Sequence, residues 1–532
     1  MRLFTEGEIR YLEADCMKAL GPEDPTLMTR AGRALGEKCL EIGPGLDTPM
    51  KVLVVCGKGG NGGDGLVAAG FLQEKGHSVT VFLMSAVEAL RGECTRHYQA
   101  LFNRGGRILP LVTPEDLALF KTEMKTHDLL VDAIFGIGFK GEMKAFDEAV
   151  IRIVNGFEGR ILSADIPSGI GADTGRVGGT AVRADFTLTF GFAKVGLFLE
   201  PGKSHVGELS VFDLGLKPEK DKKGEVLEVI TPQWCVRALP QRSPVAHKGD
   251  FGHVLVIGGQ RGMPGAVVMA AEAALLSGAG LVSIAAPEGL HDIIAMKLTE
   301  VMQHPLPQAQ GGHVNPVAVK EVLVALQKAT VVALGPGMGT ASETVAFVKL
   351  ILPQIKVPLV VDADGLNCIS EILKEEENFF SRLKMPLVVT PHPGELSRLT
   401  GLSVEDLESH RVANARTYAK AWGVTLVSKG AATLVAEGER VHLNPTGNSG
   451  MATGGSGDVL TGIISGLLAQ GMAPFEAASL AVYLHGRAGD LALLDKGSYS
   501  LRAGDLLAYL PKAFCSLKNP EEIPGFEKRS TD

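Results

Sequence analysis

The sequence lacks the features that mark several specialised classes of protein. Its 7 cysteines are scattered, with no CxxC or Cys/His spacing, which argues against a disulfide framework and a zinc site. No long basic run is present and the formal net charge is −8, so a nucleic-acid partner is not expected. The N-terminus carries acidic residues where a signal peptide would need an uninterrupted apolar run. We therefore expect a cytoplasmic protein that acts on small molecules.

Long hydrophobic runs are also missing. Residues 262–287 carry only Glu272 as a charge, but glycine and proline interrupt them. The pattern changes from helix-like to strand-like at Gly278–Gly280. We interpret this stretch as a buried helix followed by a strand, and we expect no membrane partner.

What is present is length, glycine and a regular alternation of elements. The 532 residues exceed what one hydrophobic core usually supports, and the 66 glycines suit many tight turns. Apolar, β-branched runs separated by helical stretches are typical of parallel strands covered by helices on both faces. Such runs begin near residues 51, 78, 127, 160 and 185, and again near 252, 281, 331, 358, 386 and 424. The sequence thus predicts an α/β fold in two domains, the first of them a Rossmann-like, doubly wound sheet.

Residues 216–242 interrupt this alternation. The stretch is first charged and then punctuated by proline, with no sustained periodicity, which favours a linker. We place the two domains at residues 1–225 and 226–532. The last residues, 519–532, have no apolar pattern and are expected to be frayed.

The segment Gly447–Gly471 joins a glycine-rich turn to an apolar helix. Free N–H groups at a helix start attract negative charge, and glycines let a phosphate approach the backbone closely. An aspartate is a poor choice for an anion site, so we interpret Asp458 as a base. It would take a proton from a hydroxyl that attacks the bound phosphate. The alternative is that Ser456 or Asp458 only caps the helix.

Other strand ends in the second half also carry polar groups. Lys429 could meet a phosphate as a point charge, or be an ordinary surface lysine. His392 stands between two prolines, which would aim its ring at a ligand or fix it as a structural residue. Asp362 and Asp364 are candidates to hold Mg²⁺ together with nucleotide phosphates, and helix capping explains them equally well.

Taken together, the motifs GMPGA, GPGMG, VDADGLN, TPHPGE, KGAAT and GNSGMATGGSGDVLTG resemble the ribokinase-like superfamily. Within it they look like the ADP/ATP-dependent NAD(P)H-hydrate dehydratase family. The resemblance implies a ribokinase-like α/β domain that uses ADP or ATP, with Mg²⁺, to phosphorylate and then remove the ring hydroxyl of hydrated NADH or NADPH. It implies that Asp458 is the base. The implied hydrate contacts are Ala266, Gly337, Gly339, His392 and Asp458. The implied nucleotide contacts are Lys429, Gly430, Ala431, Ala432, Thr433 and Gly457.

A second glycine loop, GKGGNGGDG at residues 57–65, follows the first predicted strand. It has neither the GxGxxG order of a dinucleotide fingerprint nor the ending of a P-loop. Asn61 lies in this loop, and Asp132 and Ser168 follow later strands. Neighbouring strand ends converge in a doubly wound sheet, so these oxygens could surround a monovalent cation. Ordinary caps and turns are the alternative.

The motifs GKGGNGGDG, VDAIFGIG and SADIPSG look like the NAD(P)H-hydrate epimerase family. The resemblance implies a K⁺ ion held by Asn61, Asp132 and Ser168. The implied hydrate contacts are Gly60, Asn61, Gly62, Gly63, Asp64, Gly136, Ile137, Gly138, Phe139, Lys140, Gly141, Glu142 and Asp165. We expect Asp165 to assist loss and return of the ring hydroxyl, although Asp64 could serve instead.

The two resemblances together predict one chain that interconverts the R and S hydrates and dehydrates the S form. The expected partners are NADHX, NADPHX and ADP or ATP, and we expect a homo-oligomer. One alternative stays open for each half: a ribokinase-like kinase for a vitamin precursor, and a non-catalytic nucleotide-sensing module.

Overall fold

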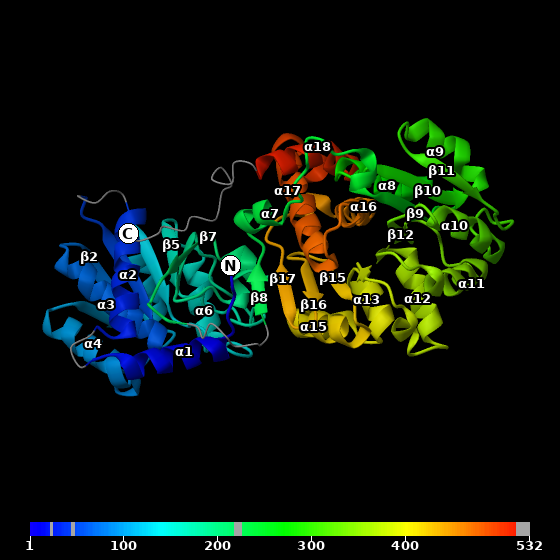
Figure 1. The fold of residues 1–532 in the computed structure, drawn as a ribbon. Helices are drawn as coiled ribbons and strands as arrows, with labels where there is room; N and C mark the ends of the chain where they lie inside the picture. Colours follow the sequence, from blue (N-terminus) through cyan, green and yellow to red (C-terminus); the bar gives the residue numbers. More distant parts are fainter. Residues whose placement is uncertain (22–24, 44–47, 218–225, 518–532) are drawn as a thin grey trace. The chain divides into compact units, whose positions relative to one another are not determined.

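The computed structural model describes residues 1–21, 25–43, 48–217 and 226–517. The chain divides into two compact units. The main segment of the first is Arg2–Lys223, and that of the second is Gly224–Ile523. In Figure 1 the first is coloured from blue to cyan and the second from green to red. The tail at 519–532 and most of the charged stretch before residue 226 lie outside the described residues.

The first unit is built on a seven-stranded sheet in which every neighbouring pair is parallel. Its spatial order is β3-β2-β1-β4-β5-β6-β7, so the order reverses between β1 and β4. In sheets of this kind ligands bind at the carboxyl ends of the strands beside that reversal. The strands are β1 (Lys51–Cys56), β2 (Ser78–Leu83), β3 (Arg107–Pro110), β4 (Leu129–Ala133), β5 (Arg160–Ala164), β6 (Phe186–Phe190) and β7 (Glu208–Phe212).

Helices cover both faces of this sheet (Figure 1). Strand β1 shows why: Val52 and Val54 belong to one hydrophobic cluster, and Leu53 and Val55 to another on the opposite face. Successive side chains of a strand alternate between faces, so an all-apolar strand needs a helical layer on each side. The helices are α1 (Glu6–Ala19), α2 (Leu27–Ile42), α3 (Gly60–Glu74), α4 (Gly92–Asn103), α5 (Asp116–Met124) and α6 (Ala145–Val154). The doubly wound α/β prediction is confirmed.

Helix α3 begins inside the glycine loop rather than after it. A Cβ at Gly62 would lie 1.8 Å from the carbonyl oxygen of Gly57, and one at Gly65 would lie 2.7 Å from the Cβ of Ala133. Both distances are far below van der Waals contact, so only glycine fits. The glycines therefore let the first turns of α3 press against the ends of β1 and β4.

The second unit contains a ten-stranded sheet in the order β11-β10-β9-β12-β13-β14-β15-β16-β17-β8. Only β16 runs antiparallel to its neighbours. The strands are β8 (Val226–Val229), β9 (His253–Ile257), β10 (Leu281–Pro287), β11 (Met302–Leu306), β12 (Val331–Leu334), β13 (Leu359–Val361), β14 (Leu387–Val389), β15 (Thr425–Ser428), β16 (Leu434–Glu437) and β17 (Arg440–Leu443). The strands predicted in this half are all present, so the α/β prediction holds here too.

The predicted linker is partly wrong, because residues 226–238 form secondary structure. Strand β8 alternates half-buried and buried residues and pairs with β17 at the edge of the sheet. Helix α7 (Pro232–Ala238) begins after Thr231, whose hydroxyl accepts the backbone N–H of Trp234. Proline is favoured in the first turn of a helix, because a backbone N–H at that position would make no hydrogen bond within the helix. A short edge strand and a proline-led helix thus look like a linker in the sequence.

The other helices of this unit pack around the sheet, and α16 and α8 pack closely together. A Cβ at Gly462 of α16 would lie 2.1 Å from the carbonyl oxygen of Ala270 in α8. The helices are α8 (Pro264–Leu276), α9 (His291–Lys297), α10 (Val319–Leu326), α11 (Ser342–Ile351), α12 (Asp364–Leu373), α13 (Pro393–Thr400), α14 (Val404–Ser409), α15 (Arg411–Trp422), α16 (Ser456–Ala469), α17 (Pro474–Ser500) and α18 (Ala503–Ser516).

The apolar stretch at 262–287 is a helix followed by a strand, α8 and β10, as the sequence predicts. Across the residues that the structure describes, no helix combines the length and apolar character needed to span a bilayer.

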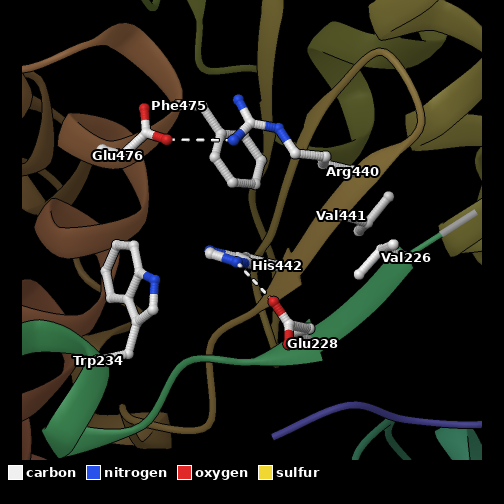
Figure 2. A pocket seen from close by; sticks show the side chains of 8 residues that line it. All are labelled: Val226, Glu228, Trp234, Arg440, Val441, His442, Phe475 and Glu476. Carbon is white, nitrogen blue, oxygen red and sulfur yellow. Dashed lines mark hydrogen bonds and ion pairs between the residues drawn. The ribbon is translucent and has the colours of Figure 1, made fainter. Parts of the chain in front are cut away.

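A cavity of about 180 Å³ lies beside strands β8 and β17 (Figure 2). Inside it, Arg440 lies over the ring of Phe475 and forms an ion pair with Glu476 at 3.1 Å. Arg440 begins β17, so this end of the cavity is remote from the carboxyl ends of the strands. The lining residues are Val226, Glu228, Trp234, Arg440, Val441, His442, Phe475 and Glu476.

The α8–α16 contact predicts a stability effect at Gly462. We expect Gly462→Ala to lower the free energy of unfolding by about 1–3 kcal/mol, because the added methyl group forces the two helices apart. Gly504→Ala in α18 is the matched control: nothing lies within 4 Å of its Cβ position, and alanine there should be neutral or stabilising. Calorimetric unfolding of both variants checks this. Equal effects at the two positions would contradict the close packing.

Candidate functional site

Five neighbouring parallel strands of the second unit, β9 and β12 to β15, point their carboxyl ends to one edge of the sheet. The segments that follow them supply most of the predicted site residues. Gly337 follows β12, and a Cβ placed on it would lie 2.9 Å from the Cβ of Ala266. The backbone N–H of Gly339 donates to Asp364 at 2.9 Å. The predicted hydrate contacts Ala266, Gly337 and Gly339 are therefore brought to one place.

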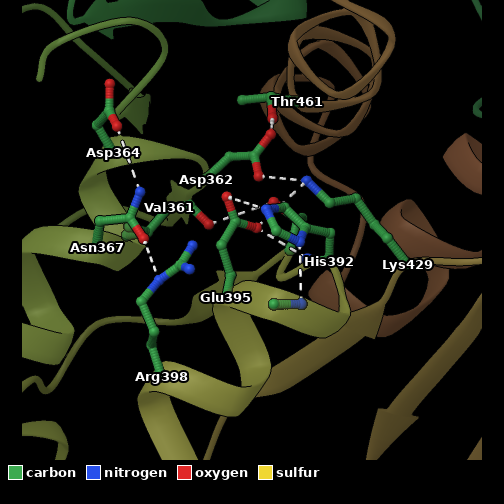
Figure 3. Close-up of polar contacts among 11 residues, drawn as sticks. Val361, Asp362, Asp364, Asn367, His392, Glu395, Arg398, Lys429 and Thr461 are labelled. Carbon is green, nitrogen blue, oxygen red and sulfur yellow. Dashed lines mark hydrogen bonds and ion pairs between the residues drawn. The ribbon is translucent and has the colours of Figure 1, made fainter. Parts of the chain in front are cut away.

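The half-buried Lys429 and the buried Asp362 form an ion pair at the centre of this edge (Figure 3). The Nζ atom of Lys429 donates to Oδ1 of Asp362 at 2.7 Å, and the Thr461 hydroxyl donates to Oδ2 at 2.7 Å. Burial alone would raise the pKa of Asp362, but the Lys429 charge and these hydrogen bonds hold it below its usual value. Burial would likewise lower the pKa of Lys429, but Asp362 and Glu395 raise it. Both groups are therefore charged at neutral pH.

Glu395 and His392 lie beside this pair at the start of α13. The backbone N–H of His392 donates to Glu395 at 2.8 Å, and the His392 ring accepts from the backbone N–H of Gly394 at 3.1 Å. The ring is thus held in place, as the flanking prolines suggest. Burial raises the pKa of Glu395 to about 7, although Lys429 lies 3.8 Å away. Burial and then Lys429 lower the pKa of His392, so its ring is neutral at neutral pH.

Asp458 lies in the first turn of α16, directly after the glycine-rich turn. A Cβ at Gly457 would lie 3.2 Å from Nζ of Lys429 and 3.5 Å from Oδ2 of Asp362, so the turn closes over the ion pair. Burial, and then the negative charge of Asp362, raise the pKa of Asp458 to about 7. A carboxyl group with such a pKa can accept a proton and release it again near neutral pH.

The segment 429–433 lies next to the ion pair, at the end of β15. Ala432 has φ = 57°, a left-handed conformation that is rare for alanine. The buried Arg411 beneath the segment donates to the carbonyl oxygen of Ala431. Residues held in such a conformation are typical of ligand-binding loops. The predicted nucleotide residues Lys429, Gly430, Ala431, Ala432, Thr433 and Gly457 thus share one side of the site.

Sequence reasoning missed several groups here. Thr461 stands one helical turn after Asp458 and could have been inferred from that spacing. Glu395 completes a capping box with His392, a signature visible in the sequence. Nε2 of His485 donates to the carbonyl oxygen of Ser456 at 3.0 Å, and burial lowers the pKa of this histidine to about 4. No sequence pattern connects His485 to the site, because it lies in the middle of α17.

The first unit brings together the three predicted K⁺ ligands. The Ser168 hydroxyl donates to Asp132 at 2.6 Å, and the amide of Asn61 donates to the carbonyl oxygen of Phe135 at 2.9 Å. The backbone N–H of Phe135 donates to the Ser168 hydroxyl at 2.8 Å. The oxygen ligands that these residues offer a cation are one carboxylate, one amide oxygen, one hydroxyl and one backbone carbonyl. This all-oxygen set with a single charge fits a monovalent cation.

Asp165 occupies the end of β5 with φ = 64° and forms a buried ion pair with Lys194. Asp64 of α3 and Glu13 of α1 face it, and burial followed by the charge of Asp165 raises the pKa of both carboxyl groups. Lys194 and Glu13 were not anticipated from the sequence. Lys194 follows β6 in the motif FGFAK, and its position at a strand end is the signal that could have found it.

The predicted contact loop at residues 136–142 is held by helix α1. Lys140 forms an ion pair with the buried Glu6 at 2.7 Å. A Cβ at Gly138 would lie 2.8 Å from the Arg10 guanidinium. Within the described residues, no group of three or more His, Cys, Asp or Glu side chains is placed to hold a metal ion.

The raised pKa of Asp458 makes a prediction about stability. Its ordinary value is 3.8 and its folded value about 7, so folding opposes its ionisation. Stability is then lost as the pH rises from 3.8 to about 7, and stays lost above. We expect Asp458→Asn to raise the free energy of unfolding by about 1–3 kcal/mol near pH 8 and to change it little near pH 4.

Asp116 provides the opposite control for this measurement. Backbone N–H groups of Val112 and Thr113 lower its pKa, so Asp116→Asn should destabilise the protein near pH 8. Thermal unfolding at both pH values checks the two variants. A loss of stability in Asp458→Asn near pH 8 would contradict the electrostatic description of the site.

Two protein-family models match the chain. Residues 254–512 match the model described as NAD(P)H-hydrate dehydratase, and residues 25–196 match the model described as YjeF-related protein N-terminus. A solved structure of ADP/ATP-dependent NAD(P)H-hydrate dehydratase from Bacillus subtilis, co-crystallized with ATP/Mg²⁺, is 28% identical. The match covers 56% of this chain and 100% of that one, with a TM-score of 0.46.

Full-length relatives cover both halves. The bifunctional NAD(P)H-hydrate repair enzyme of Moorella thermoacetica is 41% identical, over 98% of each chain. The enzyme of the same name from Coxiella burnetii is 38% identical, over 96% of this chain and 98% of the relative. Since identity extends over nearly the whole length of both, the chain belongs to the family of bifunctional NAD(P)H-hydrate repair enzymes.

Proposed function

We propose that this chain repairs hydrated NADH and NADPH by two reactions on separate domains. Residues 1–225 interconvert the R and S hydrates, and residues 226–532 dehydrate the S hydrate at the expense of ADP or ATP. The observation that carries the second activity is the position of Asp458. It lies at a glycine-rich helix start beside a charged Lys429–Asp362 pair, with a pKa of about 7.

In the dehydration, Asp458 takes the proton of the ring hydroxyl as its oxygen attacks the terminal phosphate of the nucleotide. The phosphate-bearing oxygen is then a good leaving group. Its bond to the ring carbon breaks with help from the ring nitrogen, and the neighbouring carbon loses a proton. The products are the reduced nicotinamide, inorganic phosphate and, if ADP is used, AMP.

The ion pair and the glycine amides stabilise the charge that develops on the transferred phosphate. Lys429 is held by Asp362 at 2.7 Å, so the ammonium group is fixed before the nucleotide arrives. The N–H of Ser456 donates to the carbonyl oxygen of Thr453 at 3.3 Å. The next N–H groups of the first turn of α16, those of Gly457 and Asp458, are the ones we assign to phosphate oxygens. We assign Lys429, Gly430, Ala431, Ala432, Thr433 and Gly457 to the nucleotide, and Ala266, Gly337, Gly339 and His392 to the hydrate.

Mg²⁺ would neutralise nucleotide phosphates in this site. The two carboxylates considered for it are already engaged: Asp362 accepts from Lys429 and Thr461, and Asp364 accepts from Gly339 and, at 3.3 Å, from Asn367. Mg²⁺ readily keeps water and phosphate oxygens as its main ligands. We therefore propose that the ion is held chiefly by the nucleotide and water rather than by Asp362.

In the epimerisation, the ring hydroxyl leaves as water after taking up a proton, which gives a planar iminium cation. Water then adds to the other face and gives up a proton. We propose that Asp64, whose pKa burial raises, gives the proton to the leaving hydroxyl and that Asp165 takes the proton that the adding water gives up. Proton exchange between the two carboxyl groups then restores the starting state. K⁺ held by Asn61, Asp132 and Ser168 would supply a fixed positive charge for the dinucleotide. The hydrate contacts would come from residues 60–64 and 136–142 together with Asp165.

A kinase for a vitamin precursor with a sensing module in front is the alternative left by the sequence. It is not favoured, because the relatives that match both halves over their full length are named as repair enzymes. The cytoplasmic location and the homo-oligomeric state stay predictions.

Two single substitutions should separate the two activities. Asp458→Ala should abolish recovery of reduced nicotinamide from either hydrate and leave their interconversion intact, because only the phosphorylation base is removed. Asp165→Asn should slow interconversion on the order of 100-fold and leave dehydration of the pure S hydrate intact. Dehydration is followed by the absorbance of the reduced nicotinamide ring, and interconversion is followed by chromatography of the two hydrates. Full-rate dehydration by Asp458→Ala would refute its assignment as the base.

A further inference from the structure

Lys194 is one of the most deeply buried charged groups of the first unit. Its side chain is 1% exposed, and it lies four residues beyond the end of β6. Burying an ammonium group is costly unless every N–H finds an acceptor and a negative charge lies close by. The role of Lys194 can therefore be inferred from the groups that its three N–H groups contact.

All three N–H groups of Lys194 have acceptors. Nζ donates to Oδ1 of Asp165, to the hydroxyl of Thr189 at 2.9 Å and to the carbonyl oxygen of Phe190 at 2.8 Å. Oδ1 of Asp165 also accepts from the backbone N–H of Phe190 at 3.1 Å and from the Thr189 hydroxyl at 3.2 Å. One oxygen of Asp165 is thus saturated. Within the described residues no hydrogen bond is made by its other oxygen, Oδ2.

The backbone of Asp165 is also constrained. Its φ of 64° lies in the left-handed region, which costs roughly 1–2 kcal/mol for a residue other than glycine. Its backbone N–H donates to the carbonyl oxygen of Leu188 at 2.8 Å. The ion pair and this hydrogen bond hold the residue in that conformation. Such strain persists where a side chain must be aimed.

Two further carboxyl groups lie near Asp165, so a cation is needed to balance their negative charge. Asp64 from α3 and Glu13 from α1 face it, and both carboxyl groups have raised pKa values because of burial and the charge of Asp165. Lys194 opposes the shift in both. Lys194 is thus the cation paired with Asp165 within a group of three carboxyl groups.

The N-terminal segment contacts the backbone next to Lys194. The backbone N–H of Phe4 donates to the carbonyl oxygen of Ala193 at 3.0 Å, and Phe4 pairs with Lys194 in a parallel bridge. The ring of Phe4 stacks on Phe192 at 4.1 Å. The backbone that carries the lysine is therefore ordered on both sides of the ion pair.

We propose that Lys194 is a positioning residue of the epimerase site, which anchors Oδ1 of Asp165 so that Oδ2 is left to take the proton that the adding water gives up. This proposal rests on the proposed epimerase function. Lys194 itself transfers no proton, because its three N–H groups are all engaged in the protein. Its effect on the rate passes through Asp165.

The test compares Lys194→Met with Lys194→Arg in the full-length chain. Lys194→Met should slow interconversion of the hydrates on the order of 100-fold while dehydration of the pure S hydrate continues. The acidic limb of its pH–rate profile should move to higher pH, because a buried carboxylate without its cation takes up a proton more readily. Lys194→Arg should return the limb to its original position, since it restores the charge.

Lys38 provides the matched control. Its side chain is 8% exposed and pairs with Glu41 at 3.3 Å in the same unit, and it is not among the hydrogen-bond or ion-pair partners of Asp165. Lys38→Met should leave the pH profile of interconversion unchanged. A Lys194→Met variant that epimerises normally, or one that is slower with an unmoved acidic limb, would overturn the proposal. Failure of the unchanged protein to interconvert the hydrates would instead refute the proposed epimerase function itself.

Discussion

The ion pair between Lys429 and Asp362 is the interaction on which the dehydratase site depends. It forms at 2.7 Å where the ends of β13 and β15 meet the start of α16. With Thr461 as a third partner, it holds a fixed positive and a fixed negative charge in a buried place. That arrangement keeps Asp362 ionised and, through its negative charge, helps to raise the pKa of Asp458 to about 7. Breaking it would leave a buried charge unpaired, which is strongly destabilising.

The candidate sites of the two halves share the same arrangement of charged groups. Each has a lysine–aspartate pair at a strand end, Lys194–Asp165 in one and Lys429–Asp362 in the other. Each places a further carboxyl group with a raised pKa on a helix that starts among glycines, Asp64 on α3 and Asp458 on α16. The glycines allow close approach of the backbone to a ligand. Each lysine is paired with one carboxylate beside another carboxyl group whose pKa is raised.

The sequence predicted the α/β fold and most of the strands, because a buried parallel strand is a short, uninterrupted apolar run. It missed β3, β7, β8, β11, β16 and β17, which lie at or near the edges of the two sheets. It also assigned β8 and α7 to a linker. It identified Asp458, Lys429, Asn61 and Asp132 because they stand in compact motifs at strand ends. It could not identify His485, Lys194 or Glu13, because only the packing of distant elements brings them to a site. The roles of all these residues are still proposals.

The central claim is that the ring hydroxyl leaves with the phosphate. Its most direct test follows the oxygen atom. An S hydrate whose ring hydroxyl carries heavy oxygen is turned over once with ADP on the Asp165→Asn variant, in which epimerisation does not wash out the label. Mass analysis of the inorganic phosphate should then find the heavy oxygen in every molecule released. Phosphate that carries only oxygen from the nucleotide and the solvent would contradict the account.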